Sequence, residues 1–116
     1  MSRPRVLIID DEPSNLGLLR QILKEEYNLF FAKGGEEGLA AVGRHEPALI
    51  MLDVRMPDMD GLEVQRRLNE ADLNFPVIML TGHGDIAVTV AAMKMGAVDF
   101  LVKPFRFEEL VMRLRA

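Results

Sequence analysis

Charged side chains follow three short apolar runs of the chain, and their types suit phosphoryl chemistry. Asp10 and Asp11 follow the first of these runs. Asp53 follows the second run and Lys103 the third. If the runs are parallel strands of one sheet, these groups meet at the edge where open α/β sheets bind ligands. Clustered carboxylates repel one another unless a cation joins them, and a lysine opposite them can hold an anion. The pattern therefore points to a divalent metal ion and a phosphoryl group.

The size and composition of the chain define its broad class. Its 116 residues suit one hydrophobic core, so we expect a single domain over residues 1–116. Hydrophobic residues make up 49% and charged residues 28%, as in soluble folded domains. The net charge of −4 argues against nucleic-acid binding through a basic face of this domain. Because the chain has no cysteine, disulfides and thiolate metal sites are excluded.

The first apolar run bears on the location of the protein. It contains only four residues, Val6–Ile9, which is too short for a signal-peptide core or a membrane span. We therefore expect a cytoplasmic protein that does not enter a membrane.

Short apolar runs alternate five times with longer amphipathic stretches. The runs predict strands near 5–9, 28–32, 48–52, 76–80 and 99–102, and the stretches predict helices near 14–25, 35–44, 61–70, 85–95 and 107–115. Pro13 suits the first turn of a helix, where Asp11 or Glu12 can accept hydrogen bonds from free amides. Gly96 suits a left-handed cap after the fourth helix. The alternation predicts a (βα)5 fold of class α/β.

The predicted strands show little polar alternation, which indicates a parallel sheet covered by helices on both faces. Right-handed crossovers then give a doubly wound, flavodoxin-like sheet of five strands in the order 2-1-3-4-5. In this order the chain reverses direction between strands 1 and 3. Asp10 and Asp11 are therefore expected beside Asp53.

Four segments of the chain resemble the receiver domain of response regulators in two-component signal transduction. They are residues 7–12, 52–61, 76–82 and 96–105, and they follow the order and spacing of that family. Each segment alone is a weak signal, but together they are specific and span essentially the whole chain. Residues 81–85 and 91–94 are most similar to receivers of transcription-factor response regulators.

The resemblance implies a metal-assisted phosphorylation site. Asp53 would be the nucleophile and would become an aspartyl phosphate. Asp10, Asp11 and Asp53 would hold Mg²⁺ together with the backbone carbonyl of Arg55. Glu12 is expected to be a solvated or capping acid.

Three more residues receive roles from the resemblance. Lys103 would contact the phosphoryl oxygens, and a cis Lys103–Pro104 bond would direct its side chain inward. Thr81 would donate its hydroxyl to a phosphoryl oxygen, and Phe100 would be the switch aromatic that turns inward when Thr81 moves. Without the resemblance, Thr81 would be a strand-end residue bonded to the backbone and Phe100 a core residue.

The resemblance also implies partners. A sensor histidine kinase would supply the phosphoryl group, and the domain would catalyse only its own phosphorylation and autodephosphorylation. It is therefore not expected to be an enzyme with a separate substrate. Phosphorylation would change the surface of the fourth helix, fifth strand and fifth helix, through which a homodimer or an output domain would dock. The last helix ends without a stop signal, which suits a domain taken from a longer regulator.

The predicted fourth helix is apolar on two sides. Ala87, Val88, Ala91 and Met95 form one stripe at helical spacing, whereas Ile86, Val90 and Met93 form a second stripe nearly opposite. We expect one stripe to cover the sheet and the other to be partly exposed.

Two other classes share part of this pattern. A phosphatase of the dehalogenase type would place its acids as Asp-x-Asp after the first strand, whereas Asp10 and Asp11 are adjacent. A flavin-binding flavodoxin would need a hydroxyl-rich phosphate loop there, and these acids would repel its phosphate. Turnover of many phosphate monoesters would favour the first class, and a yellow colour on purification the second.

His83 lies two residues past Thr81, where it is either a residue that tunes phosphoryl loss or an ordinary loop residue.

Overall fold

A computed structural model of the chain describes residues 3–82 and 84–115, apart from the side chains of residues 107 and 115. The strands are β1 (Arg5–Ile9), β2 (Asn28–Ala32), β3 (Leu49–Asp53), β4 (Val77–Thr81) and β5 (Asp99–Val102). The helices are α1 (Pro13–Leu23), α2 (Gly35–His45), α3 (Gly61–Glu70), α4 (Ile86–Lys94) and α5 (Phe107–Arg115). None of the helices in this part of the chain is long and apolar enough to cross a membrane.

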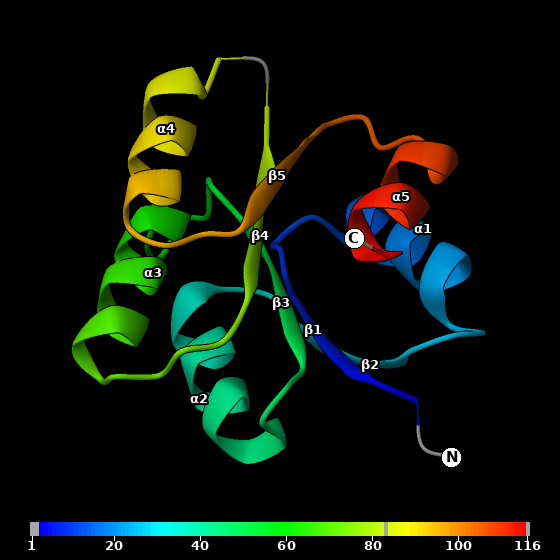
Figure 1. The fold of residues 1–116 in the computed structure, drawn as a ribbon, viewed down its shortest axis with the longest axis horizontal. Coiled ribbons are helices and arrows are strands. Elements are labelled where there is room, and N and C mark those ends of the chain that lie inside the picture. The colour runs from blue at the N-terminus through cyan, green and yellow to red at the C-terminus, as the bar shows by residue number, and fades with distance from the viewer. Residues whose placement is uncertain (1–2, 83, 116) are drawn as a thin grey trace.

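The five strands form one parallel sheet in the order β2-β1-β3-β4-β5. Helices α2, α3 and α4 cover one face of this sheet, and α1 and α5 cover the other (Figure 1). The predicted fold class and strand order are therefore confirmed. The left-handed conformation predicted for Gly96 is also confirmed, since its φ angle is 115°.

The strand bounds differ from the prediction at the carboxyl end of the sheet. β3 and β4 each end one residue later than the predicted ranges, so that Asp53 and Thr81 are the last residues of their strands. The reason is that the backbone pairing continues past them. Val54 N–H donates to Leu80 C=O at 3.0 Å, and Lys103 N–H donates to Thr81 C=O at 2.8 Å. The backbone at both residues is therefore fixed by the sheet.

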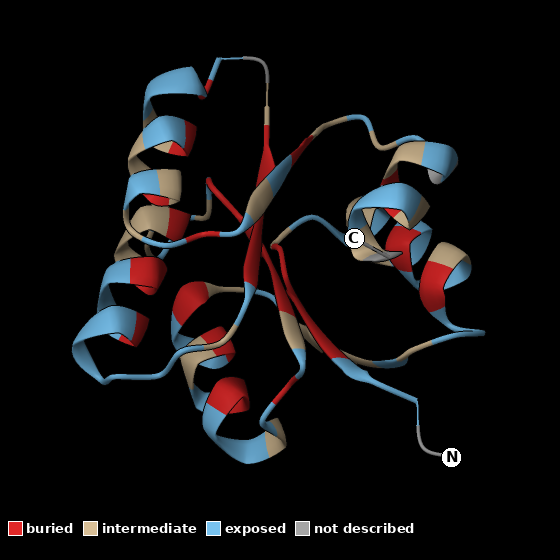
Figure 2. Cartoon of the chain, in the orientation of Figure 1, coloured by how far each residue is buried: buried red, intermediate tan, exposed pale blue. Residues whose placement is uncertain are grey.

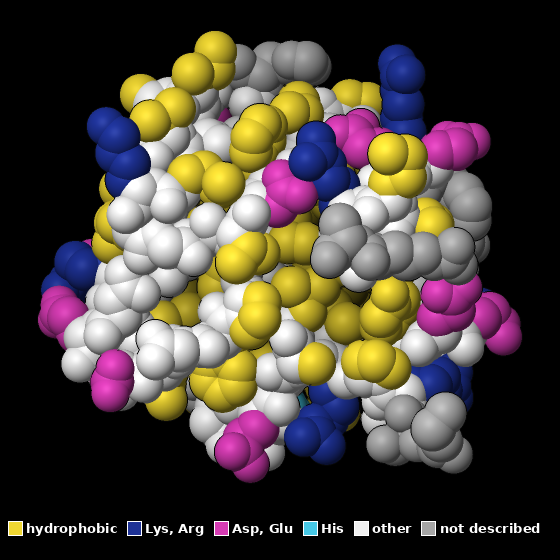
Figure 3. All heavy atoms as spheres, in the orientation of Figure 1, with side chains coloured by type: hydrophobic (Ala, Val, Ile, Leu, Met, Phe, Trp, Pro, Cys, Tyr) yellow, Lys and Arg dark blue, Asp and Glu magenta, His cyan; other side chains and the backbone are white. Residues whose placement is uncertain are grey.

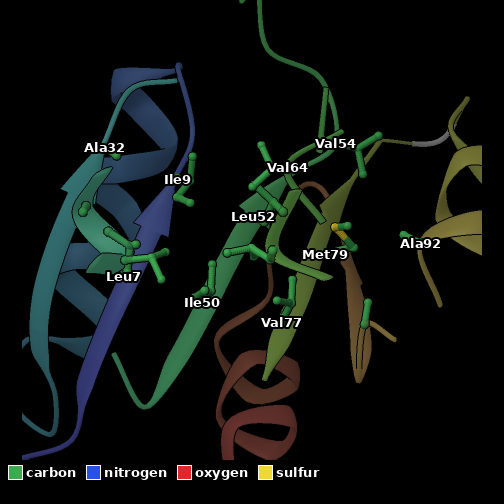
Figure 4. Close-up of a cluster of buried hydrophobic side chains, with 14 residues drawn as sticks. Leu7, Ile9, Ala32, Ile50, Leu52, Val54, Val64, Val77, Met79 and Ala92 are labelled. Atoms are coloured by element: carbon green, nitrogen blue, oxygen red, sulfur yellow. The ribbon is translucent and has the colours of Figure 1, made fainter. Parts of the chain in front are cut away.

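Each face of the sheet has its own hydrophobic core. Because side chains alternate along a strand, Leu7 and Ile9 of β1 pack toward α2 and α3, whereas Val6 and Ile8 pack toward α1 and α5. Figure 2 shows the buried residues along the strands and on the sheet-facing sides of the helices. Figure 4 shows the first of these cores, with Leu52 and Met79 at its centre. Burial on both faces explains why the strands lack polar alternation.

The loop between β3 and α3 is tied to α2. Asp58 accepts hydrogen bonds from the backbone N–H groups of Gly35 and Glu36, each at 3.0 Å. It thereby caps a helix more than 20 residues earlier in the chain. These bonds lower the pKa of Asp58 below its usual value.

The same loop closes tightly where α3 begins. Gly61 N–H donates to Val54 C=O at 2.7 Å, and a Cβ atom at Gly61 would lie only 2.6 Å from the carbonyl oxygen of Asp53. Only glycine fits this close approach. The loop that carries Asp53 into α3 is therefore held at both of its ends.

We predict that Asp58→Ala lowers the free energy of unfolding at pH 7 by about 1 kcal/mol, because two helix amides lose their acceptor. The pKa of Asp58 is lowered in the folded state, so its stabilising effect is present above the unfolded value of 3.8 and is lost as the pH falls through the folded value. The difference between the proteins should therefore shrink in strong acid. Urea denaturation at several pH values measures both effects. Asp58→Asn, which keeps one acceptor oxygen, should lose less; equal stability of Asp58→Ala and wild type at pH 7 would contradict the capping role.

Candidate functional site

Three carboxylates meet at the carboxyl ends of β1 and β3, as the sequence predicts. Asp10 and Asp53 are buried and Asp11 is partly exposed. One carboxylate oxygen from each of the three lies within 4.8 Å of the others. The strand order produces this cluster, because β1 and β3 are adjacent although α1, β2 and α2 separate them in the chain.

Hydrogen bonds from the start of α1 fix Asp10. Its Oδ1 accepts from Glu12 N–H at 2.9 Å, and its Oδ2 accepts from the side-chain amide of Asn15 at 3.2 Å. The expectation that Asp11 or Glu12 would cap α1 is wrong for Glu12, which stands at the cap position and makes no side-chain cap bond. The Asp10 carboxylate, rather than a side chain at the cap position, accepts from the Glu12 amide. Asp11 makes no hydrogen bond or ion pair within the described residues, which leaves its carboxylate available to the cluster.

Lys103 lies opposite the acids. Its Nζ is 3.0 Å from Oδ1 of Asp53 and 3.5 Å from Oδ2 of Asp10. The Lys103–Pro104 peptide bond is cis, which confirms the prediction. Oδ1 of Asp53 also accepts from Arg55 N–H at 3.2 Å. Both donors use the same oxygen, so Oδ2 of Asp53 is left for an incoming group.

Burial and neighbouring charges shift the pKa values of Asp53 and Lys103. Burial and the neighbouring charge of Asp10 raise the pKa of Asp53 to about 7, although Lys103 and the Arg55 N–H act in the opposite direction. Burial lowers the pKa of Lys103, but its hydrogen bond to Asp53 and the charges of both acids outweigh burial, so the net shift is upward. One ammonium group therefore does not neutralise three carboxylates. Hard carboxylate oxygens in an electron-rich cluster are a donor set that fits Mg²⁺.

Thr81 is the last residue of β4, and Phe100 lies on the neighbouring strand β5. The Thr81 hydroxyl is buried and donates to Gly82 C=O at 3.2 Å, as expected for a strand-end residue considered alone. The Phe100 side chain is 37% exposed, so the core position that it would have without the resemblance is wrong. Thr81, Met93 and Phe100 line a cavity of about 560 Å³ between α4 and β5.

The rotation of α4 differs from the prediction. Its buried residues are Thr89 and Ala92, and neither predicted stripe forms the buried face by itself. Ile86 is 74% exposed and Val90 is also exposed, as expected for the second stripe, whereas Met93 packs against the core. Figure 3 shows the hydrophobic side chains that gather over α4 and toward β5. The prediction failed because nearly every position of this helix is apolar.

Three polar residues near the site were missed by sequence reasoning: Asn15, Asp85 and Thr89. The Asp85 carboxylate is buried and accepts from the side-chain Nε of Arg55 and from Gly82 N–H. Asp85, Thr89 and Ala92 are spaced as one helix face, and that spacing was the signal that could have identified them.

His45 is not part of the carboxylate cluster. His45 stacks on Phe30, with ring centroids 4.0 Å apart. His83, for which two roles were considered, lies outside the described residues.

Comparison with known proteins identifies one family. The family model of the response regulator receiver domain matches residues 6–115. The transcriptional regulatory protein TrcR of Mycobacterium tuberculosis is 39% identical over 112 residues, which cover 96% of this chain and 44% of that protein. The response regulator protein TodT of Pseudomonas putida is 41% identical over 112 residues, covering 96% of this chain and 49% of that protein. The chain thus spans about half the length of these curated relatives.

Solved structures agree with this result. The signal receiver domain of a putative Luxo repressor protein from Vibrio parahaemolyticus superimposes with a TM-score of 0.90 at 35% identity, covering 97% of this chain and 88% of that one. A putative response regulator from Chloroflexus aurantiacus gives a TM-score of 0.91 at 33% identity, with coverage of 98% and 96%.

We predict that Asp53→Asn raises the free energy of unfolding at pH 8, without divalent cations, by on the order of 2 kcal/mol, because it removes a buried charge that its neighbours disfavour. The folded-state pKa of Asp53 is raised from 3.8 to about 7, so the folded protein holds a proton that the unfolded chain has lost. Wild-type stability should therefore rise as the pH falls through 7, and the advantage of the variant should shrink toward pH 4.

Urea denaturation at pH 8 and pH 5 measures this difference. Asp72→Asn is the matched control, because Asp72 is exposed and its φ of 58° is one that asparagine also adopts. A loss of stability in Asp53→Asn at pH 8 would mean that the ion pair with Lys103 outweighs burial and repulsion.

Proposed function

Because the chain belongs to the receiver-domain family of response regulators, a family of signalling domains, we propose that Asp53 accepts a phosphoryl group from the phosphohistidine of a sensor histidine kinase. One observation carries this proposal. The buried Asp53 carboxylate stands among two further acids and 3.0 Å from the Lys103 ammonium, at the carboxyl edge of a parallel sheet.

The geometry supports an in-line transfer. A carboxylate oxygen of Asp53 forms a bond to phosphorus while the bond from phosphorus to the imidazole nitrogen breaks, and its electron pair returns to the imidazole. Oδ2 is the oxygen that we assign to the attack, since Lys103 and the Arg55 N–H both hold Oδ1. The Lys103 ammonium would bind the phosphoryl oxygens and offset their charge. Thr81 would donate its hydroxyl to one of these oxygens.

We further propose that the carboxylates of Asp10, Asp11 and Asp53 and the backbone carbonyl of Arg55 hold Mg²⁺. When bound, Mg²⁺ would offset the repulsion between the carboxylates and the incoming phosphoryl group. The raised pKa of Asp53 fits this assignment, because burial first and the charge of Asp10 second both disfavour its ionised form, which a bound cation would stabilise. A cation in the cluster would also keep Asp53 ionised, which its role as nucleophile requires.

The output is proposed to pass through the surface of α4, β5 and α5. Ile86, Val90 and Phe100 are exposed apolar side chains on this surface, and such patches usually have a partner. A second copy of the domain, or an output domain of a longer regulator, is the proposed partner. The names of the relatives as transcriptional regulators, and the share of their length that this chain spans, support an output domain. Phe100 would act as the switch aromatic. A cytoplasmic location stays a prediction.

The two alternative classes receive less support. The nucleophile of a dehalogenase-type phosphatase follows the first strand, whereas Asp53 ends β3. The first loop carries the acids 10–12 where a flavin phosphate would bind in a flavodoxin. Family membership and the cluster both favour the receiver function.

Incubation with acetyl phosphate and Mg²⁺ should add one phosphoryl group that is stable in acid and labile in base, because an acyl phosphate forms on Asp53. Intact-mass spectrometry measures the addition, and a histidine kinase carrying phosphohistidine should give the same product. Asp53→Asn should remain unlabelled, while Asp72→Asn should label as wild type does. Undiminished labelling of Asp53→Asn would sink the assignment.

Removal of Mg²⁺ by a chelator should abolish labelling, and Asp11→Ala should lose both Mg²⁺ binding and labelling. Its free energy of unfolding should be equal to or above that of wild type, because one of several repelling carboxylates is gone. Calorimetric titration and urea denaturation measure the two effects. Glu12→Ala is the control, since Glu12 is exposed and adjacent but outside the cluster. A destabilised Asp11→Ala that still becomes labelled would instead identify Asp11 as a structural acid.

A further inference from the structure

Two buried hydroxyl groups form a hydrogen bond between β4 and α4. Oγ1 of Thr89 lies 2.9 Å from Oγ1 of Thr81, and both side chains are almost fully buried, Thr89 being 7% exposed. The Thr89 hydroxyl also lies 2.7 Å from the carbonyl oxygen of Asp85, four residues earlier in the chain. Thr89 is thus a polar residue on the buried face of a helix that is otherwise mostly apolar.

The number of protons limits what these hydroxyls can do. Each threonine hydroxyl has one proton to donate. Within the described residues, the two protons serve three contacts: Thr81 with Thr89, Thr89 with the Asp85 carbonyl, and Thr81 with the Gly82 carbonyl. The Thr81 hydroxyl accepts from Thr89 of α4 and donates its own proton to Gly82 C=O. It cannot turn to donate toward Asp53 without giving up these contacts.

The first turn of α4 also holds the backbone next to Thr81. The buried Asp85 carboxylate accepts from Gly82 N–H at 3.2 Å and pairs with the side chain of Arg55. Asp85 C=O additionally accepts the N–H of Thr89 at 2.9 Å. If the Thr81 hydroxyl leaves, Thr89 keeps its contact with this carbonyl, so breaking the hydroxyl pair leaves no other group of α4 without a partner.

We propose that Thr89 is a positioning residue that holds the Thr81 hydroxyl away from Asp53 and thereby weakens the affinity of the site for a phosphoryl group. This inference rests on the proposed function, in which Thr81 donates to the phosphoryl oxygen on Asp53. The donation takes place only after the hydroxyl pair is broken. Breaking the pair costs free energy. This cost lowers the affinity of the site for a phosphoryl group and favours the unphosphorylated arrangement.

The test compares Thr89→Val, which removes the hydroxyl and nearly keeps the shape, with Thr89→Ser, which keeps the hydroxyl. The probe is beryllofluoride with Mg²⁺, a stable mimic of the phosphoryl group, and calorimetric titration gives its affinity. The resting state of Thr89→Val lacks the contact that must be broken, so its binding should be tighter, by at most about fivefold, the equivalent of one net buried hydrogen bond. Thr89→Ser should bind as wild type does. Unchanged or weaker binding by Thr89→Val would overturn the inference.

A double-mutant cycle separates the hydroxyl pair from changes in helix packing. In a Thr81→Ala background the pair is already absent, so adding Thr89→Val should leave the affinity unchanged. An equal gain in both backgrounds would show that the effect arises from packing of α4 and would overturn the proposal. Thr89→Ala replaces Thr89→Val if the latter does not fold by circular dichroism. If wild type binds no beryllofluoride, the proposed function itself fails; if wild type binds and Thr89→Val equals it, only this inference fails.

Discussion

Electrostatic repulsion among buried carboxylates is the constraint on which the functional edge of this domain depends. Asp10 and Asp53 are removed from water next to Asp11, and a single ammonium group, that of Lys103, faces them. Such an arrangement does not form on its own, because ionised groups without sufficient counter-charge are unstable in a protein interior. It persists because the acids are attached to strands whose apolar residues are fully buried on both faces.

The surrounding backbone reduces part of the repulsion. Glu12 N–H donates to Asp10 and Arg55 N–H donates to Asp53, so each buried acid receives a main-chain donor from the residue two positions later. These donors are available because the chain turns sharply at the end of each strand. Asp58 and the close approach at Gly61 hold the turn after β3 in that shape. The site therefore depends on loops that are fixed from outside it.

The sequence predicted those parts of the site that depend on strand ends. Asp10, Asp53 and Lys103 follow apolar runs, and strand order alone brings them together. Side chains whose position depends on the rotation of a helix were not predicted, namely Asp85 and Thr89. Rotation is read from apolar periodicity, and α4 has apolar residues on nearly every side, so its pattern contained little information about which face is buried. Asn15 was missed for another reason. It lies on α1, whereas its hydrogen-bond partner, Asp10, is buried in the segment just before that helix, so helical periodicity does not connect the two residues.

α4 is organised almost in reverse of an ordinary surface helix. A threonine lies on its inner side, and the large apolar residues Ile86 and Val90 face outward. Since apolar area removed from water is what fastens a helix to its sheet, this helix gains less attachment free energy than its composition suggests. Segments with few buried apolar contacts are the ones that open first when a protein fluctuates. The domain thus combines a well-buried sheet with a helix that is attached less firmly than its composition suggests, so a small change at the end of β4 is expected to displace α4 before it loosens the core.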